Sequence, residues 1–374
     1  MTDFVVDRLH REVIAPVQQR FVGRDDVVDL IALTVVAGEH LFLHGPPGTA
    51  KSALIRTFAR AVRGRYFEYM LTRFTEPNEI FGPIDIAKLR DGKVITVTTG
   101  MLPEAEFVFL DELFNANSAI LSSLLTILNE RVFRRGLETH SLPLLSLFSA
   151  SNHLPEEDAL KALFDRFLLR CHVDNLHRDA MPRLLQAGWD LEQTPLPESS
   201  LNADDLRRLA KSIFRVDLSG ALEVYREAAH KVRDLGIAFS DRRAVKVQKL
   251  LAASALLCGR TAAQPSDLWV LRYVWDREEQ IEALSALVNG ILEQHAEDAK
   301  KRPLATVLRA VDAEELARQI QGIEKDLGPT LTLSQIARLK ERLATLADQI
   351  AWTRDENVRQ HLSENIRKCW QKLG

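Results

Sequence analysis

The sequence predicts an α/β protein. It is expected to have a five-stranded parallel sheet with helices on both faces, then an all-helical lid and a C-terminal helical bundle. Short apolar runs alternate with helical periodicity up to about residue 175, and the pattern becomes purely helical from about 190 to 275. Beyond 276, apolar residues recur at the 3.5-residue spacing of packed helices, over too few heptads for a long coiled coil. We therefore expect domains at 1–190, 191–278 and 279–374.

Composition excludes several classes of protein. The 374 residues are 46% hydrophobic and 27% charged, as in ordinary globular proteins, and the net charge of −3 gives no general attraction to nucleic acid or anionic membranes. Cys171, Cys258 and Cys369 form no C-x-x-C pair, which argues against a disulfide framework or a cysteine zinc site. We find no signal peptide or membrane span and expect a cytoplasmic protein.

The elements of the first domain follow from apolar periodicity. A long helix is expected at 118–130, and hairpins are expected at 84–98, around Asp91-Gly92, and at 131–141. Either hairpin could project from the sheet. The predicted strands are 41–44, 66–70, 107–110, 144–149 and 167–172.

The stretch after the first predicted strand has the pattern of a phosphate-binding loop. It contains Gly45-Pro46-Pro47-Gly48-Thr49-Ala50-Lys51-Ser52, and Ala53 continues into a segment with helical spacing. In such a loop, backbone N–H groups and the helix N-terminus hold phosphate oxygens. The lysine reaches the terminal phosphates and the serine hydroxyl binds Mg²⁺. Ala50 replaces the usual second glycine, so we expect it to have a negative φ, as a helix-entry residue would.

An apolar pair, Phe21-Val22, precedes this loop in the sequence. Val22 could floor an adenine ring. A hydrophobic staple onto the following helix would explain the pair equally well.

Two carboxylates, Asp111 and Glu112, end the third predicted strand. They would lie beside the phosphate loop if that strand neighbours the first. Asp111 suits Mg²⁺ held through a water, and Glu112 could orient and deprotonate an attacking water. A strand that ends in acids is a weak signal alone, but the phosphate loop about sixty residues earlier makes it strong.

Polar residues flank the last two predicted strands. Asn152 follows the fourth, where an amide could bind both the attacking water and a γ-phosphate; a turn-forming asparagine is the alternative. Arg166 precedes the fifth and could reach a neighbouring subunit's γ-phosphate. An ion pair with Asp165 or Glu157 is the competing interpretation, and Arg170 is a weaker candidate for the same role.

Arg242 and Arg243 fall in the first turn of a helix that Ser240 is expected to cap. Positive charge there opposes the helix dipole, and a bound polyanion would reverse the sign of that interaction. This favours phosphate sensing over an accidental exposed pair.

Together, the loop at 45–52, Asp111-Glu112, Asn152, 165–167 and 240–243 resemble the MoxR family of AAA+ ATPases. The resemblance covers roughly residues 10–280. Segments 69–74, 81–83, 102–106 and 240–243 are similar to its RavA branch. Leu113-Phe114-Asn115, where many members have Ile-Asn-Arg, also favours that branch. Residues 281–374 are too short and too helical for the β-rich domain inserted in RavA-like chains.

The resemblance implies an AAA+ core that assembles as a homo-hexamer, with ATP and Mg²⁺ between subunits. Lys51 and Ser52 would be the P-loop residues, Asp111 and Glu112 the Walker B pair, and Asn152 sensor 1. Arg166 would be a finger directed at the neighbour. Arg242, rather than Arg243, would be the lid sensor for its own subunit's nucleotide. Ala50 would be ordinary in such loops.

The same resemblance implies chaperone-like remodelling of a protein client, commonly with a partner that contains a von Willebrand factor A domain. The alternative function is a nucleic-acid-associated NTPase motor, favoured only by the cluster Arg131, Arg134 and Arg135. Weak net acidity makes nucleic acid an improbable ligand. Asp111, Glu112 and Asn152 together argue against a passive nucleotide-binding scaffold.

Overall fold

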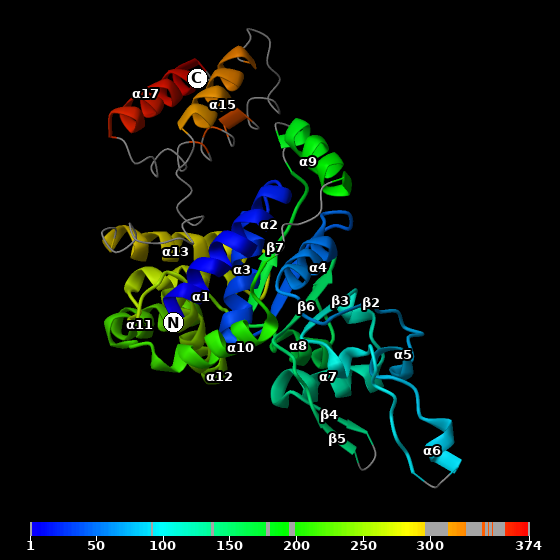
Figure 1. Cartoon of the computed structure of the whole chain (residues 1–374). Coiled ribbons are helices and arrows are strands. Elements are labelled where there is room, and N and C mark those ends of the chain that lie inside the picture. The colour runs from blue at the N-terminus through cyan, green and yellow to red at the C-terminus, as the bar shows by residue number, and fades with distance from the viewer. Residues whose placement is uncertain are drawn as a thin grey trace. The chain divides into compact units, whose positions relative to one another are not determined.

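The computed structural model describes residues 2–90, 93–135, 138–176, 180–193, 199–295, 313–326, 339–340, 343, 346 and 356–372. The chain divides into two compact units, Met1–Leu304 and Ala305–Gly374, which are described separately (Figure 1).

A parallel five-stranded sheet lies at the centre of the first unit, as predicted (Figure 1). Its strand order is β2-β3-β6-β1-β7, and its strand bounds lie within two residues of those expected from the sequence. The strands are β1 (Leu41–His44), β2 (Tyr66–Met70), β3 (Phe107–Asp111), β6 (Ser146–Ser151) and β7 (Leu169–His172). Phe42 of β1 packs against the rings of Phe114 and Phe164, with centroids 5.3 and 5.1 Å away. The apolar runs therefore form the core beneath the carboxyl ends of the strands.

Helices surround this sheet and continue into the lid. Helices α3 and α4 pack against it, and α10 and α12 of the lid region pack against α3. The helices up to β7 are α1 (Thr2–Arg8), the π-helix η1 (Leu9–Ile14), α2 (Ala15–Arg20), α3 (Asp25–Ala37), α4 (Lys51–Ala61), α5 (Pro77–Phe81), α6 (Ile86–Arg90), η2 (Leu102–Glu104), η3 (Leu113–Asn115), α7 (Ser118–Glu130) and α8 (Asp158–Phe164). Those after β7 are α9 (Met181–Gln193), α10 (Ala203–Ser212), η5 (Ile213–Arg215), α11 (Ser219–Asp234), α12 (Asp241–Leu257), η6 (Pro265–Tyr273) and α13 (Gln280–Gln294).

One predicted hairpin is confirmed, and the other is formed only in part. Strands β4 (Val132–Arg135) and β5 (Glu138–Ser141) form the second hairpin. In the first, one bridge joins Ile84 to Thr96, but 86–90 form helix α6. The Asp85 carboxylate accepts the N–H groups of Ala87 and Lys88 and so starts that helix. The expected turn at Asp91-Gly92 lies outside the described residues.

The lid behaves as its sequence predicts. The Ser240 hydroxyl accepts the N–H of Arg243 at 3.2 Å and caps α12, which ends just before Gly259 with φ of 68°. Helix α13 packs against η6 within the first unit.

The second unit is held by an apolar cluster of its own. Helices α15 (Ala313–Asp326) and α17 (Glu356–Lys372) pack together. The buried cluster consists of Ile320, Ile323, Leu339, Leu343, Leu346, Leu362, Ile366 and Cys369. Apolar residues from all three predicted helical segments therefore meet within one chain, as an intramolecular bundle requires.

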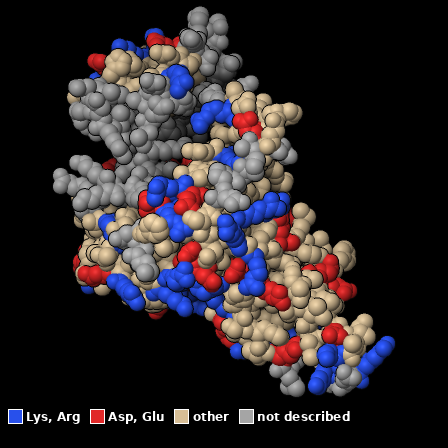
Figure 2. Space-filling view, viewed as in Figure 1, with Lys and Arg blue, Asp and Glu red and all other residues tan. Residues whose placement is uncertain are grey.

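Charges of both signs are mixed on the face shown in Figure 2. The arginines of the second hairpin have local partners: Arg131 donates to backbone carbonyls of Gly38 and Leu145, and Arg134 pairs with Glu130. Arg135 donates to the Gly82 carbonyl. The three arginines that favoured a nucleic-acid motor thus make hydrogen bonds and an ion pair within their own chain.

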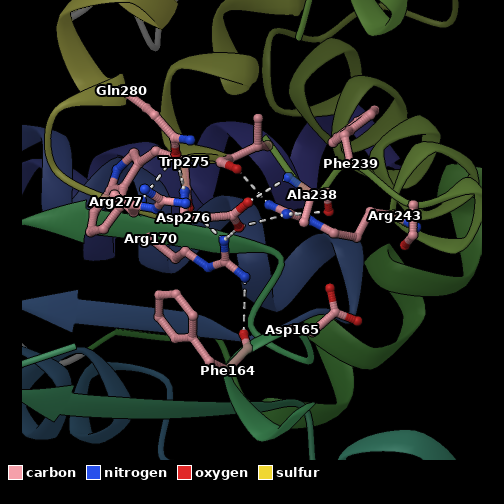
Figure 3. A network of polar contacts seen from close by, with 12 residues as sticks. Phe164, Asp165, Arg170, Ala238, Phe239, Arg243, Trp275, Asp276, Arg277 and Gln280 are labelled. Atoms are coloured by element: carbon pink, nitrogen blue, oxygen red, sulfur yellow. Dashed lines mark hydrogen bonds and ion pairs between the residues drawn. The ribbon is translucent and has the colours of Figure 1, made fainter. Parts of the chain in front are cut away.

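A buried ionic network joins the sheet to the lid (Figure 3). Arg170 of β7 and Arg243 of α12 both pair with Asp276, which also accepts the Ala238 N–H at 2.6 Å. Burial alone would raise the pKa of Asp276, but the Arg243 and Arg170 guanidinium groups outweigh it and hold that pKa below its usual value. The carboxylate therefore stabilises the fold at neutral pH, and this contribution is lost as pH falls through the lowered pKa.

Removing the shared carboxylate should cost more than removing an exposed one. Asp276→Ala leaves two buried guanidinium groups without their anion, so we expect the free energy of unfolding to fall by about 3–5 kcal/mol. Asp234→Ala, at an exposed lid position, should change it by less than about 0.5 kcal/mol. Chemical denaturation of both variants checks this, and equal stabilities would contradict the role given to the network.

Candidate nucleotide-binding site

The phosphate-loop pattern lies at the carboxyl edge of the sheet. Gly45 follows β1, Glu112 follows β3 and Asn152 follows β6. Strands β3 and β1 are not direct neighbours, because β6 lies between them and pairs with both. The register matches Asp111 with Ala150 and His44 with Ser151, so Asn152 emerges between the acids and the loop. Parallel strand direction thus gathers three predicted side chains at one edge.

The loop holds its lysine inward. Lys51 Nζ donates to the carbonyls of Gly45 at 2.9 Å and Pro46 at 2.7 Å and to the Thr49 hydroxyl at 3.2 Å. Burial lowers the pKa of Lys51, while the charges of Asp111 and Glu112 act in the opposite direction. The ammonium group of Lys51 is held by neutral oxygens and lies close to two acids. It is therefore free of a direct ion pair in these contacts and suited to pair with a phosphate group.

The two glycines of the loop have different surroundings: another backbone segment lies against Gly45, and open space surrounds Gly48. A Cβ on Gly45 would lie 2.0 Å from the Val173 carbonyl oxygen, so no side chain fits there. Gly48 has φ of 80°, and a Cβ there would meet nothing within 4 Å. The loop is therefore packed closely at Gly45 and borders open space at Gly48.

Ala50 contradicts our expectation of a negative φ. It has φ of 63° and ψ of 22°, in the left-handed region, as the N-cap of α4. A side chain costs about 1–2 kcal/mol in this conformation. The loop geometry imposes the conformation that the usual glycine would adopt without strain.

Asp111 and Glu112 have different environments. Burial raises the pKa of Asp111, while the Glu112 N–H at 3.0 Å and Lys51 act to lower it. Glu112 has φ of 53°, so its backbone turns directly after the strand. A bound cation would offset the burial of Asp111, whose carboxylate oxygens are of the kind that Mg²⁺ accepts, and Ser52 is the second residue of α4.

Asn152 is exposed directly after β6. Its side-chain oxygen accepts from His153 Nδ1 at 2.7 Å. The amide N–H groups are those that would donate to a phosphate oxygen.

Val22 lines a cavity of about 320 Å³. A hydrophobic staple requires an apolar residue directly before the N-cap of α3, but the N-cap is Arg24 and Gly23 precedes it. Val22 therefore does not form that staple, and its role beneath an adenine ring stays a prediction. The other lining residues are Ala15, Gln18, Gln19, Gly23, Asp25 and Arg183.

The two arginine candidates lie at the opposite edge of the sheet. Arg166 lies between α8 and the amino end of β7, and its Nη1 pairs with Asp165 at 2.9 Å, as the competing interpretation foresaw. Arg242 donates to the side chain of Asn129 near the C-terminal end of α7. Helix α7 starts at the carboxyl edge of the sheet and runs back over 13 residues, or about 20 Å, so this end lies at the opposite edge. Burial and the nearby Arg242 lower the pKa of Arg166. This placement differs from the expectation that Arg242 meets its own subunit's nucleotide.

Arg170 and Arg243 are structural by burial. Each side chain is at most 2% exposed, and both pair with Asp276 (Figure 3). The Arg170 guanidinium also lies over the Phe164 ring, 3.9 Å from its centroid. Neither can extend into solvent without breaking the network, so Arg166 and Arg242 are the better candidates of each pair.

Sequence reasoning missed the far walls of the cavity at Val22. Gln18 and Gln19 come from α2, and Arg183 comes from α9 after the last strand. No local motif marks them, since only the folded chain brings these helices together. Arg24, whose charge lowers the pKa of Lys51, was missed for the same reason.

Relief of the left-handed strain can be measured. Ala50→Gly should raise the free energy of unfolding by up to about 1 kcal/mol, because glycine adopts this φ freely but loses more entropy on folding. Ala162→Gly, at an exposed position inside α8, should instead lower it by about 1 kcal/mol. Chemical denaturation compares them, and equal losses would show that φ at Ala50 carries no strain.

The chain is similar in sequence to known proteins. Residues 7–211 match the MoxR domain of MoxR-vWA-beta-propeller ternary systems, and residues 221–288 match an AAA lid domain. Two uncharacterized proteins of Methanocaldococcus jannaschii are each 37% identical, over 74% and 71% of this chain and 73% and 71% of their own lengths. Chaperone MoxR1 of Mycobacterium tuberculosis is 29% identical over 43% of each chain.

A solved structure supports the fold. A crystal structure of a protein from Cytophaga hutchinsonii superposes with a TM-score of 0.62 at 19% identity, covering 78% of this chain and 95% of that one. With the family match over residues 7–211 and the lid match after it, the chain belongs to the MoxR family of AAA+ ATPases.

Proposed function

We propose that this protein is a ring-forming ATPase that uses ATP hydrolysis to remodel a protein partner. The observation that carries the proposal is the division of polar groups between two edges of the sheet. Lys51, Asp111 and Glu112 lie at the carboxyl edge, and Arg166 and Arg242 lie at the amino edge. A chain arranged in this way can complete a hydrolytic site only with a neighbour, and we infer a homo-hexamer.

Each residue at the carboxyl edge has a distinct task in this proposal. Lys51 leaves the loop carbonyls and pairs with the terminal phosphates, while the loop N–H groups hold the phosphate chain. Ser52 and Asp111 would hold Mg²⁺, Asp111 through a water. When bound, this ion supplies charge stabilisation for phosphoryl transfer.

Hydrolysis depends on the two remaining groups at this edge. Glu112 accepts a proton from the attacking water, and the Asn152 amide orients that water against the γ-phosphate. The Val22 cavity would hold the adenine base, with Val22 against the ring face.

We infer that Arg166 and Arg242 both act on a neighbour's γ-phosphate. Their proximity within one chain is unfavourable, since the two positive charges repel each other and Arg166, which pairs with Asp165, is only 19% exposed. A phosphate from the adjoining subunit would relieve that repulsion. Hydrolysis would then remove the γ-phosphate that both arginines contact and weaken the interface between subunits. The ring would shift between two arrangements according to whether the γ-phosphate is present.

The partner follows from the family. The matched domain is described as part of MoxR-vWA-beta-propeller ternary systems, so we propose a von Willebrand A protein and a β-propeller protein as partners. Leu113-Phe114-Asn115 supports placement near the RavA branch. Within the described residues, no helix combines the length and apolarity needed to cross a membrane. We propose that the protein works in the cytoplasm.

The proposed base can be tested without disturbing nucleotide binding. Glu112→Gln keeps the shape but removes the proton acceptor, so phosphate release should fall by at least about 100-fold while ATP affinity stays within about twofold. Glu227→Gln, exposed on α11, should leave both unchanged. Steady-state phosphate release and equilibrium ATP binding are the measurements, and undiminished turnover would remove Glu112 from the reaction.

Mixed rings decide which subunit each arginine serves. Arg166→Ala and Arg242→Ala should each abolish turnover alone, as should Lys51→Ala. Mixing either arginine variant with Lys51→Ala subunits should restore partial turnover, because some interfaces then join an intact Lys51 to an intact arginine.

An arginine that served its own subunit's nucleotide would give no rescue, since no site would then be intact. Lack of rescue for Arg242→Ala alone would return it to the role of a sensor in its own chain. Arg226→Ala, on the exposed face of α11, should be fully active by itself.

A further inference from the structure

Two histidines and a glutamate meet where β1 and β7 end. His44 is the last residue of β1, His172 is the last residue of β7, and the sheet register pairs them. Glu278, between η6 and α13, reaches both: its Oε1 lies 2.5 Å from His44 Nε2 and 3.3 Å from His172 Nδ1. The three ligand atoms all lie within 4.8 Å of one another. None of these residues has a task in the ATPase proposal.

The surroundings of His44 direct one nitrogen toward this cluster. Its Nδ1 lies 3.2 Å from the Ser151 carbonyl, which can only accept, so Nδ1 carries the proton and donates. Its ring packs edge-on against Trp275, with centroids 6.4 Å apart, and its side chain is 9% exposed. The other nitrogen, Nε2, is thereby held toward Glu278. Histidine metal ligands have this arrangement, with one nitrogen tied to a carbonyl and the other presented to the ion.

We propose that His44 Nε2, His172 Nδ1 and a Glu278 carboxylate oxygen bind a divalent transition-metal ion of the Zn²⁺ class. Bonds of about 2.0–2.1 Å in a tetrahedral site place ligand atoms about 3.3 Å apart. The contact between His172 and Glu278 already has that separation, and the Glu278 side chain, 45% exposed, has freedom to adjust the others.

The donor set distinguishes this ion from the nucleotide's metal. Two imidazole nitrogens suit Zn²⁺, Co²⁺ or Ni²⁺, whereas Mg²⁺ selects oxygen ligands. With three protein ligands, the fourth position is left to water.

Such an ion would connect two parts of the chain. His44 directly precedes Gly45, the first residue of the phosphate loop, and Glu278 lies with Trp275 and Asp276 in the loop between η6 and α13. Metal binding would link the lid to the residue that precedes the phosphate loop, and no sequence motif predicts that link. This inference does not depend on hydrolysis, because none of the three ligands has a role in the proposed reaction.

The test is direct metal binding by the full chain. Metal-free protein is titrated with Zn²⁺ against a chromogenic chelator, and with Co²⁺ while its visible absorption is recorded. We expect one high-affinity ion per chain, intense tetrahedral Co²⁺ bands, and no displacement by millimolar Mg²⁺. His172→Ala and Glu278→Gln should each weaken Zn²⁺ affinity by at least about 10-fold and remove the Co²⁺ bands.

Matched variants control for surface histidines and for the loss of charge. His230→Ala, exposed on α11, and Glu279→Gln, exposed beside Glu278, should keep wild-type affinity and spectrum. Circular dichroism checks that every variant is folded. The proposal would be overturned if the wild-type protein bound no high-affinity ion, or if the His172 and Glu278 variants bound Zn²⁺ as tightly as the wild type. The cluster would then be a hydrogen-bonded ion pair. ATP binding, measured in the same samples, reports on the proposed function separately.

Discussion

Parallel strand direction is the constraint on which the rest of this molecule depends. All five strands run the same way, so everything that follows a strand lies at one edge and everything that precedes a strand lies at the other. The phosphate loop, Glu112 and Asn152 follow strands, whereas Arg166 precedes one. Helix α7 then runs back along the sheet and places Asn129 at the amino edge, where Arg242 donates a hydrogen bond to it. Separation of acids from arginines is thus a property of topology rather than of any one contact.

Burial decides between neighbouring arginines that look alike in the sequence. Arg243 and Arg170 share the carboxylate of Asp276 in the interior, while Arg242 reaches only an amide side chain. A buried guanidinium with its counterion is costly to move, so it serves the fold. The less buried member of each pair, Arg242 or Arg166, is the one able to meet a ligand.

Much of the fold and the candidate site could be predicted from the sequence because the signals were local. Strand bounds followed from apolar runs, and the Ser240 cap and the loop at 45–52 depend on residues close together in the chain. Predictions failed where a local preference met a competing local contact or a constraint imposed by the whole fold. Asp85 starts a helix where alternation suggested a strand, and the loop forces Ala50 to φ of 63°. Strand order, and with it the edge occupied by Arg242, is set by distant pairings that no motif records.

The ionic network of Asp276 has a mechanical consequence. Arg170 belongs to a sheet strand and Arg243 to the first turn of a lid helix, and one carboxylate holds both. The base of the lid is therefore fastened to the last strand by a buried carboxylate. Hinging between lid and sheet, a familiar way for a two-domain enzyme to close on its ligand, is opposed in this chain. In the ring that we propose, displacement driven by the nucleotide would therefore occur between whole subunits, and a small rotation at each subunit contact would add up around the ring.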